Sequence, residues 1–199
     1  TFPYFKNLID RHQFDTIYHE HYQYFFLSSI DYVTNLLNLD VIDFEFVATH
    51  GGSMRCVLAS RKLGIGHSKF YQTALFDETN YLHASNENFE RFRQLTEETI
   101  ARLDNILSNA DQDGTVVCGY GAAAKTSTFL ALSKSTSPLT CIFDKAPSKI
   151  GRYIPGTAVP IRHPSEILSV APDKIIIFPW NIAGEIADEI KQIFASNNS

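Results

Sequence analysis

The sequence predicts an α/β protein whose second half is a three-layer domain built on a parallel sheet. From Thr115 onward, short apolar strands alternate with helical segments, which is typical of βαβ units. The glycine-rich segment GYGAAAK, residues 119–125, lies between the first of these strands and its helix. The run Lys174–Phe178 is almost entirely apolar, which predicts a central parallel strand buried on both faces.

The bulk composition limits the possible classes of protein. The chain has 199 residues and is 44% hydrophobic, which suits one large domain or two small ones. Its net charge of -5 argues against broad electrostatic binding to nucleic acid or anionic lipid. No apolar run approaches the roughly 20 residues of a membrane helix, and no signal peptide is visible. The chain starts at Thr1 rather than Met, so we expect a piece of a longer protein.

The cysteines indicate the compartment. Cys56, Cys118 and Cys141 are odd in number and widely spaced. This pattern favours reduced, buried thiols in a cytoplasmic protein over a disulfide framework or a CxxC metal site.

The first part of the chain predicts helices followed by a β-hairpin. Apolar residues recur at helical spacing, and two strand-like runs flank the Gly-Gly turn THGGS. The expected elements are a short helix over 4–12, a strand or loop over 13–24, a helix over 26–39, and strands over 41–48 and 54–60. Residues 61–85 read as an irregular connector.

The remaining elements follow the same reasoning. The longest helical pattern covers residues 86–107, with apolar side chains on one face and charged ones opposite. Beyond it we expect strands over 115–119, 139–144 and 174–178, helices over 122–132, 164–168 and 184–194, and a loop over 145–160.

The glycine loop predicts a Rossmann-like domain. Gly119 and Gly121 stand at the first two glycine positions of a dinucleotide loop, and Ala122 begins the helix. Lys125 adds a cation in the first helical turn, and Asp144 ends the next strand, where a ribose-binding acid is often found. The loop is not a P-loop. The alternative is that the glycines only permit a tight turn and no ligand binds.

Two neighbouring segments favour an anion site at the same sheet edge. Lys145, Lys149 and Arg152 lie in a loop stiffened by Pro and Gly, where phosphate ligands are often placed. A solvated basic loop explains them as well. Trp180 and Asn181 follow the buried strand and would supply stacking or hydrogen bonds, or simply pack.

A histidine cluster predicts proton-transfer chemistry. The segment Tyr18–Tyr22 reads YHEHY and holds two imidazoles, a carboxylate and two phenols. These are the groups needed to remove a proton from carbon beside a carbonyl. Metal ligation by His19 and His21, or a plain polar surface, are the alternatives. His50 lies in the turn THGGS, which is otherwise an ordinary hairpin turn.

The motifs IYHEHYQYF, THGGSMR, GYGAAAK, FDKAPSKIGRYIPG and FPWN occur in one order. In this they resemble the C-terminal region of sugar C-methyltransferases. Those bacterial enzymes methylate a carbon of a nucleotide-linked keto-deoxysugar with S-adenosylmethionine (AdoMet). The resemblance runs from about residue 14 to 190.

The resemblance implies how the chain is organised. Residues 1–68 resemble the C-terminal portion of the methyltransferase domain, and residues 69–199 resemble a separate Rossmann-like nucleotide-sugar-binding domain. The family's zinc-binding N-terminal domain and AdoMet-binding loop are not visible in the sequence. The resemblance therefore implies a fragment or companion subunit that is inactive alone.

The resemblance also implies a mechanism. A 4-keto group acidifies the C3–H of the sugar, a base removes that proton, and the enolate attacks the AdoMet methyl group. The match puts the base at His21, with Glu20 and Tyr18 beside it, and His50 near the sugar. A dTDP-sugar is the expected substrate.

The substrate contacts are expected around the glycine loop and the strand that follows it. The candidate phosphate ligands are Lys125, Lys149 and Arg152, with Gly119, Gly121, Ala122, Asp144, Trp180 and Asn181 lining the same site. Two other readings of the whole chain stay open: a stand-alone NAD- or nucleotide-binding module, and a scaffold for subunit contacts.

Overall fold

The computed structural model describes residues 1–47 and 52–196, apart from the side chain of Ser85. Contacts divide the chain into two compact units. Unit 1 holds Thr1–Phe14 with His19–Thr96, and unit 2 holds Asp15–Tyr18 with Glu97–Ser199. The predicted division after residue 68 concerns the domains of a family and stays a prediction.

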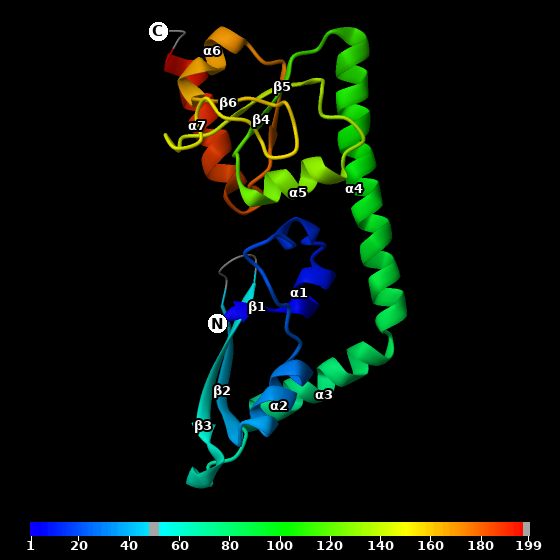
Figure 1. Cartoon of the computed structure of the whole chain (residues 1–199), viewed down its shortest axis with the longest axis vertical. Helices are drawn as coiled ribbons and strands as arrows, with labels where there is room; N and C mark the ends of the chain where they lie inside the picture. Colours follow the sequence, from blue (N-terminus) through cyan, green and yellow to red (C-terminus); the bar gives the residue numbers. More distant parts are fainter. Residues whose placement is uncertain (48–51, 197–199) are drawn as a thin grey trace. The chain divides into compact units, whose positions relative to one another are not determined.

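Unit 1 is a small antiparallel sheet covered on one face by helices (Figure 1). The strand order is β1-β3-β2, and the predicted hairpin is formed by β2 and β3. Helices α2 and α3 both contact β2. The elements are β1 (Phe2–Pro3), α1 (Phe5–Asp10), α2 (Leu27–Leu36), β2 (Leu39–Val47), β3 (Ser53–Ser60), the 3-10 turn η3 (Arg61–Leu63) and α3 (Lys69–His83).

The irregular connector expected over residues 61–85 is wrong for most of its length, because helix α3 occupies Lys69–His83. The Ser68 hydroxyl caps this helix by accepting a hydrogen bond from the Tyr71 N–H at 3.2 Å. The buried positions of the helix are Tyr71 and Glu78. A carboxylate in a core position breaks the apolar periodicity on which the prediction relied.

The Glu78 carboxylate is an internal cap for a different helix. It is only 1% exposed and accepts hydrogen bonds from the N–H groups of Leu27 and Ser28 at 2.7 and 2.8 Å. These are the first residues of α2, so the charge lies at the positive end of the helix dipole. The Tyr4 hydroxyl also donates to Glu78 at 2.8 Å. Burial and this carboxylate raise the pKa of Tyr4 far above its ordinary value.

Unit 2 is a four-stranded parallel sheet in the order β6-β5-β4-β7. Helix α4 (Ser85–Asp113) enters unit 2 at Glu97. The other elements are the 3-10 turn η1 (Phe14–Thr16), β4 (Val117–Tyr120), α5 (Ala124–Leu132), β5 (Leu139–Phe143), β6 (Ile161–Arg162), η4 (Pro164–Glu166), α6 (Ile167–Val170), β7 (Lys174–Ile177), η5 (Trp180–Ile182) and α7 (Ala183–Ser196).

Side chains alternate between the two faces of this sheet and build a core on each. One core joins Val117 and Ile142 to Leu107 of α4 and Leu130 of α5. The other core joins alternate residues of the same strands to Ile186 of α7 and to α6. Helices therefore cover both faces, which confirms the predicted Rossmann-like α/β class with three layers.

The central position predicted for the strand over 174–178 is wrong. Among the described residues, β7 pairs only with β4 and forms an edge of the sheet. Ile176 packs on the core that includes α5, whereas Ile175 and Ile177 pack on the core that includes α7. The apolar run of β7 therefore indicates that helices cover both faces of the sheet. It does not indicate whether the strand is central or at an edge.

The two glycines of the loop are required by packing. A Cβ on Gly119 would lie 2.8 Å from Phe178 and 2.9 Å from Ile142. Gly121 has φ +90°, and a Cβ there would lie 2.3 Å from Pro179. The segment after β7 therefore fills the space that the glycine side chains leave open.

We expect Gly119→Ala to destabilise unit 2 by about 1–3 kcal/mol, because the added methyl group overpacks the contact with Phe178. Gly184→Ala is the matched control, since nothing lies within 4 Å of a Cβ at this position in α7. It should be neutral or stabilising by up to about 1 kcal/mol. Urea unfolding followed by the fluorescence of Trp180 measures both. Equal stability of the two variants would contradict the packing argument.

The cysteines are free thiols, as expected. Cys118 and Cys141 are fully buried, with their sulfur atoms 3.6 Å apart on the neighbouring strands β4 and β5. The hydrogen bond to Cys118, together with burial, raises the pKa of Cys141 well above its ordinary value. Cys56 is half-buried in β3. Within residues 1–47 and 52–196, no helix is both long and apolar enough to cross a membrane.

Candidate functional site

The predicted base loop, residues 18–22, connects the 3-10 turn η1 to helix α2 and has no regular structure. His19 and Glu20 are 82% and 71% exposed, and their side chains approach to 4.0 Å. His21 is half-buried, and its ring lies edge-on to Tyr24 with centroids 6.3 Å apart. Of the two histidines in this loop, His21 is the more sheltered, which suits a residue that exchanges a proton with a bound substrate.

The remaining members of the predicted catalytic set are placed differently. Tyr18 is half-buried and belongs to unit 2 by its contacts, whereas the loop from His19 onward belongs to unit 1. His50 lies outside the residues that the structure describes. The roles of all four predicted catalytic residues stay predictions.

Asp144 holds the glycine loop in place. Its carboxylate accepts hydrogen bonds at 2.8 Å from the N–H of Ala122, which ends the loop, and from the N–H of Ala146. Lys149 adds an ion pair at 3.1 Å. The Gly121 N–H donates to the carbonyl of Phe143 at 2.7 Å. The oxygens that would bind a ribose are thus engaged with the protein's own backbone.

The cations of the basic loop over residues 145–160 differ in exposure and in pairing. Lys149 is 41% exposed beside Asp144, and Arg152 is exposed in the turn that follows. Lys145 forms an ion pair at 2.8 Å with Glu189 of α7, which also accepts a hydrogen bond from Tyr120 at 2.9 Å. Burial and the bond to Glu189 raise the pKa of Tyr120. Lys145 and Lys149 are each paired with a carboxylate, so Arg152 is the cation of this loop best placed to meet an anion.

Lys125 and Trp180 lie together at an acid that sequence reasoning missed. The indole N–H of Trp180 donates to Asp15 at 2.8 Å, and the Lys125 ammonium lies 3.7 Å from the same carboxylate oxygen. Lys125 also lies over the Trp180 ring, 4.4 Å from its centroid. Asp15 lies in the mixed polar and aromatic stretch HQFDTIYH, and nothing in the local pattern shows that it is buried. Asn181, the next residue in η5, is exposed.

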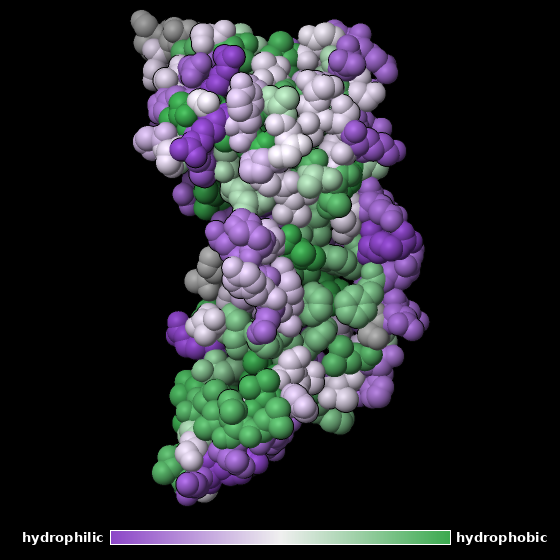
Figure 2. All heavy atoms as spheres, in the orientation of Figure 1, coloured by the Kyte–Doolittle hydropathy of each residue, from purple (hydrophilic) through white to green (hydrophobic). Residues whose placement is uncertain are grey.

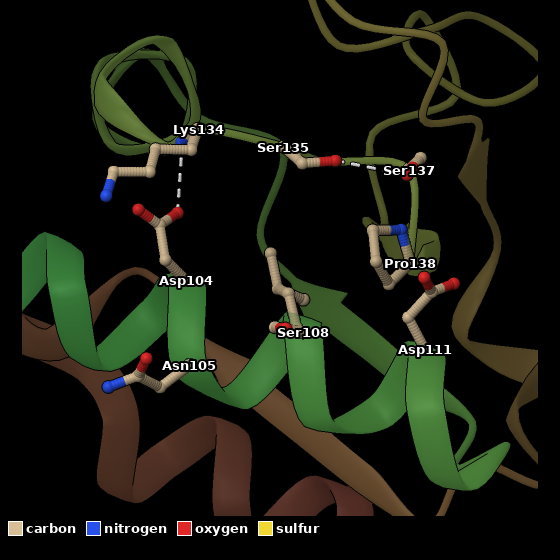
Figure 3. Close-up of a pocket in the computed structure, with 9 residues that line it drawn as sticks. Asp104, Asn105, Ser108, Asp111, Lys134, Ser135, Ser137 and Pro138 are labelled. Carbon is tan, nitrogen blue, oxygen red and sulfur yellow. Dashed lines mark hydrogen bonds between the residues drawn. The ribbon is translucent and has the colours of Figure 1, made fainter.

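A pocket of about 370 Å³ opens between the second half of α4 and the segment before β5 (Figure 3). Asp104 and Asp111 line it from α4, and Lys134, Ser135 and Ser137 line it from the opposite side. Asp104 is engaged with the Lys134 N–H at 3.0 Å. None of the predicted site residues lines this pocket.

The described residues contain no group of three or more His, Cys, Asp or Glu side chains that could hold a metal ion. An imidazole is suited to proton transfer, and lysine and arginine cations are suited to anion binding. The imidazole of His21 lies in unit 1. The cations of Lys149 and Arg152, the amide of Asn181 and the glycine turn lie in unit 2.

The parallel sheet and the polar residues that follow its strands define unit 2 as a Rossmann-like α/β domain. Residues 48–199 match the family described as the C-methyltransferase C-terminal domain, and the chain belongs to this family.

C-methyltransferase NovU from Streptomyces niveus is 30% identical to the chain over 191 residues. The alignment covers 96% of this chain but 46% of that protein. The chain thus spans less than half the length of this relative.

Proposed function

We propose that the chain is the substrate-binding and base-bearing part of an AdoMet-dependent C-methyltransferase that acts on a nucleotide-linked 4-keto-deoxysugar. The similarity to C-methyltransferase NovU over 96% of the chain carries this proposal. In this proposal, residues 1–68 complete the methyltransferase domain, and residues 69–199 bind the nucleotide-sugar. The enzyme is cytoplasmic. We assign the zinc-binding N-terminal domain and the AdoMet site to a domain or subunit other than residues 1–199.

The glycine loop does not fit the methyl donor. Phe178 and Pro179 occupy the space beside Gly119 and Gly121, and Asp144 is bonded to the backbone of the loop itself. A backbone N–H that already donates to a carboxylate is not free for a ligand phosphate or carboxylate. We therefore assign no residue of this chain to AdoMet, which supplies an electrophilic methyl group in such enzymes.

The residues of this chain act on the sugar. The 4-keto group acidifies the neighbouring C3–H, and a ring nitrogen of His21 takes this proton. The electron pair of the broken C–H bond passes into the enolate. C3 would then form the new bond to the methyl carbon as the S–CH3 bond of the sulfonium donor breaks, with that electron pair leaving on sulfur. We assign Tyr18 to hydrogen bonding with the enolate oxygen, Glu20 to a place beside the base, and His50 to the sugar.

Charge complementarity supports a diphosphate near the basic loop. Lys149 and Arg152 follow β5 at the carboxyl edge of the parallel sheet, and Asn181 is exposed in η5 after β7. The diphosphate of a nucleotide-linked sugar is negatively charged on both phosphates, and charge-assisted hydrogen bonds to Lys and Arg are the strong ones. We assign the phosphates to Lys149 and Arg152 and a sugar or base contact to Asn181.

A hydrophobic surface on unit 1 supports the expectation of an upstream part. Figure 2 shows apolar side chains gathered over the β2–β3 hairpin and α2. Phe46, Val57 and Leu58 of the hairpin are 51%, 44% and 45% exposed. Within the described residues, β1 pairs with β3 only through Phe2 and Pro3, which leaves much of that edge of β3 open. We assign this surface to contact with another part of the methyltransferase.

The alternative function is a stand-alone NAD- or nucleotide-binding module. The glycine loop and Asp144 motivate it, but the hydrogen bonds of Asp144 to Ala122 and Ala146 favour a structural role for this acid. The packing of Gly121 on Pro179 points the same way.

Calorimetry on the chain separates these functions. We expect a dTDP-linked keto-deoxysugar to bind and NAD to bind far more weakly. Arg152→Gln should weaken nucleotide-sugar binding by about 10- to 100-fold, the value of one charge-assisted hydrogen bond. Arg162→Gln is the matched control, because Arg162 pairs with Glu166 in a different turn. Tight binding of NAD without binding of the nucleotide-sugar would favour the alternative.

A further inference from the structure

The segment Asp15–Tyr18 belongs to unit 2 by its contacts, although the chain on both sides of it belongs to unit 1. Contacts with later elements hold the segment. The Asp15 carboxylate accepts the indole N–H of Trp180 at 2.8 Å. The carbonyl of Ile17 accepts a hydrogen bond from the Thr128 hydroxyl of α5 at 3.4 Å. The short stretch that leads into the base loop is thus built into the neighbourhood of the glycine loop.

The buried carboxylate of Asp15 depends on the nearby cation of Lys125. The side chains of Asp15 and Lys125 are 2% and 15% exposed, and they lie 3.7 Å apart. A buried carboxylate is tolerated only when it is paired and hydrogen-bonded, and Lys125 and Trp180 provide both. Lys125 gains a further partner in the indole ring, whose centroid is 4.4 Å from its ammonium. Moving Lys125 onto a phosphate would leave Asp15 buried without its cation.

We propose that Asp15, Lys125 and Trp180 form a clamp that positions the base loop for proton transfer. This inference rests on the proposed function, because it takes His21 as the base. His21 follows Tyr18 by three residues, and an extended residue spans at most about 3.6 Å, so fixing Asp15–Tyr18 restricts the positions open to the imidazole. The three members are positioning residues and touch no reacting atom.

The clamp gives Lys125 and Trp180 a role other than the substrate contacts expected from the motifs GYGAAAK and FPWN. A phosphate ligand contributes mainly to substrate binding, so its loss raises KM. A positioning residue contributes to the geometry of the reacting groups, so its loss lowers kcat. The two roles therefore give different kinetic signatures in the same variant.

The first test needs neither substrate nor methyl donor. The chain contains one tryptophan, so its indole fluorescence reports Trp180 alone. Asp15→Ala and Lys125→Met should each increase acrylamide quenching of Trp180 and shift its emission to the red. Hydrogen exchange of the peptide containing residues 13–23 should become faster. Asp188→Asn is the control, because Asp188 is 70% exposed and pairs with Lys191 on the surface of α7.

The second test uses the complete methyltransferase of the proposed function. Asp15→Ala and Lys125→Met should each lower kcat by about 10- to 100-fold, as expected when a reacting group is displaced by about 1 Å, with KM for the nucleotide-sugar little changed. Asp188→Asn should match the wild type. Using two clamp variants guards against one that fails to fold.

The outcomes separate the two proposals. Unchanged quenching and unchanged exchange in both clamp variants would overturn the clamp, whatever the activity. A raised KM with unchanged kcat in Lys125→Met would restore Lys125 as a phosphate ligand and also overturn it. If the wild-type enzyme transfers no methyl group, the proposed function fails and the role in proton transfer fails with it. The fluorescence and exchange results then decide only whether the attachment exists.

Discussion

If His21 is the base, as we propose, replacing it with alanine should lower kcat for methyl transfer by about 100- to 10,000-fold, the contribution of a positioned general base. The expectation concerns the complete methyltransferase of the proposed function, acting on a nucleotide-linked 4-keto-deoxysugar. KM should change little, because the imidazole acts on the C3–H bond and not on the phosphates. The measurement is transfer of labelled methyl from AdoMet to the sugar, with wild type and variant at equal concentration.

His19→Ala is the matched control for this experiment. It removes the same side chain two residues away in the same loop, at a position whose ring is 82% exposed. We expect it to retain near wild-type activity. Exchange of the C3 hydrogen with deuterated water gives a second reading of proton abstraction, and His21→Ala should abolish it. Full exchange and turnover in His21→Ala, or loss of both in His19→Ala instead, would remove His21 from the role of base.

Replacing Glu78 with alanine destabilises unit 1 by about 3–5 kcal/mol, since each buried donor left without an acceptor costs about 1–3 kcal/mol. The donors are the Tyr4 hydroxyl and the N–H groups of Leu27 and Ser28. The charge at the start of α2 is lost as well. Urea unfolding followed by circular dichroism measures the loss, and hydrogen exchange at the first turn of α2 locates it.

Asp77→Ala is the control for this change. Asp77 precedes Glu78 on α3 but is exposed, so its loss should alter stability by no more than about 0.5 kcal/mol. Glu78→Gln, which keeps one carbonyl oxygen in place, should fall between the two. If Glu78→Ala and Asp77→Ala unfold at the same urea concentration, the carboxylate does not hold the start of α2.

An element was predicted correctly where its sequence pattern lies within its own segment. The hairpin, the helix over 86–107 and the strands at Val117 and Leu139 were predictable, because each leaves a periodic or punctuated pattern in its own segment. Helix α3 was not, because the buried carboxylate of Glu78 stands where the pattern requires an apolar residue. The partner of that carboxylate lies 51 residues away at Leu27.

The residues of the candidate site were likewise predictable from local sequence, but their contacts were not. The polar residues themselves were visible as short motifs, and the order of those motifs carried the resemblance to sugar C-methyltransferases. Their partners were not visible. Asp15 meets Trp180 across 165 residues, and Asp144 turns back onto the loop of Gly121 and Ala122. A motif identifies the candidate side chains. Whether a charged side chain faces a ligand or another part of the protein depends on contacts between residues far apart in the sequence.

The sequence by itself determined the α/β class, the βαβ rhythm of the second half and the set of chemically capable residues, because periodicity and residue type are local properties. Only the tertiary structure decided that β7 lies at a sheet edge and that packing on Phe178 and Pro179 accounts for the glycines. It also decided that Lys125 compensates a buried acid. These features depend on which segments, distant in sequence, pack against one another. That packing is determined by the free energy of burying charge and apolar surface.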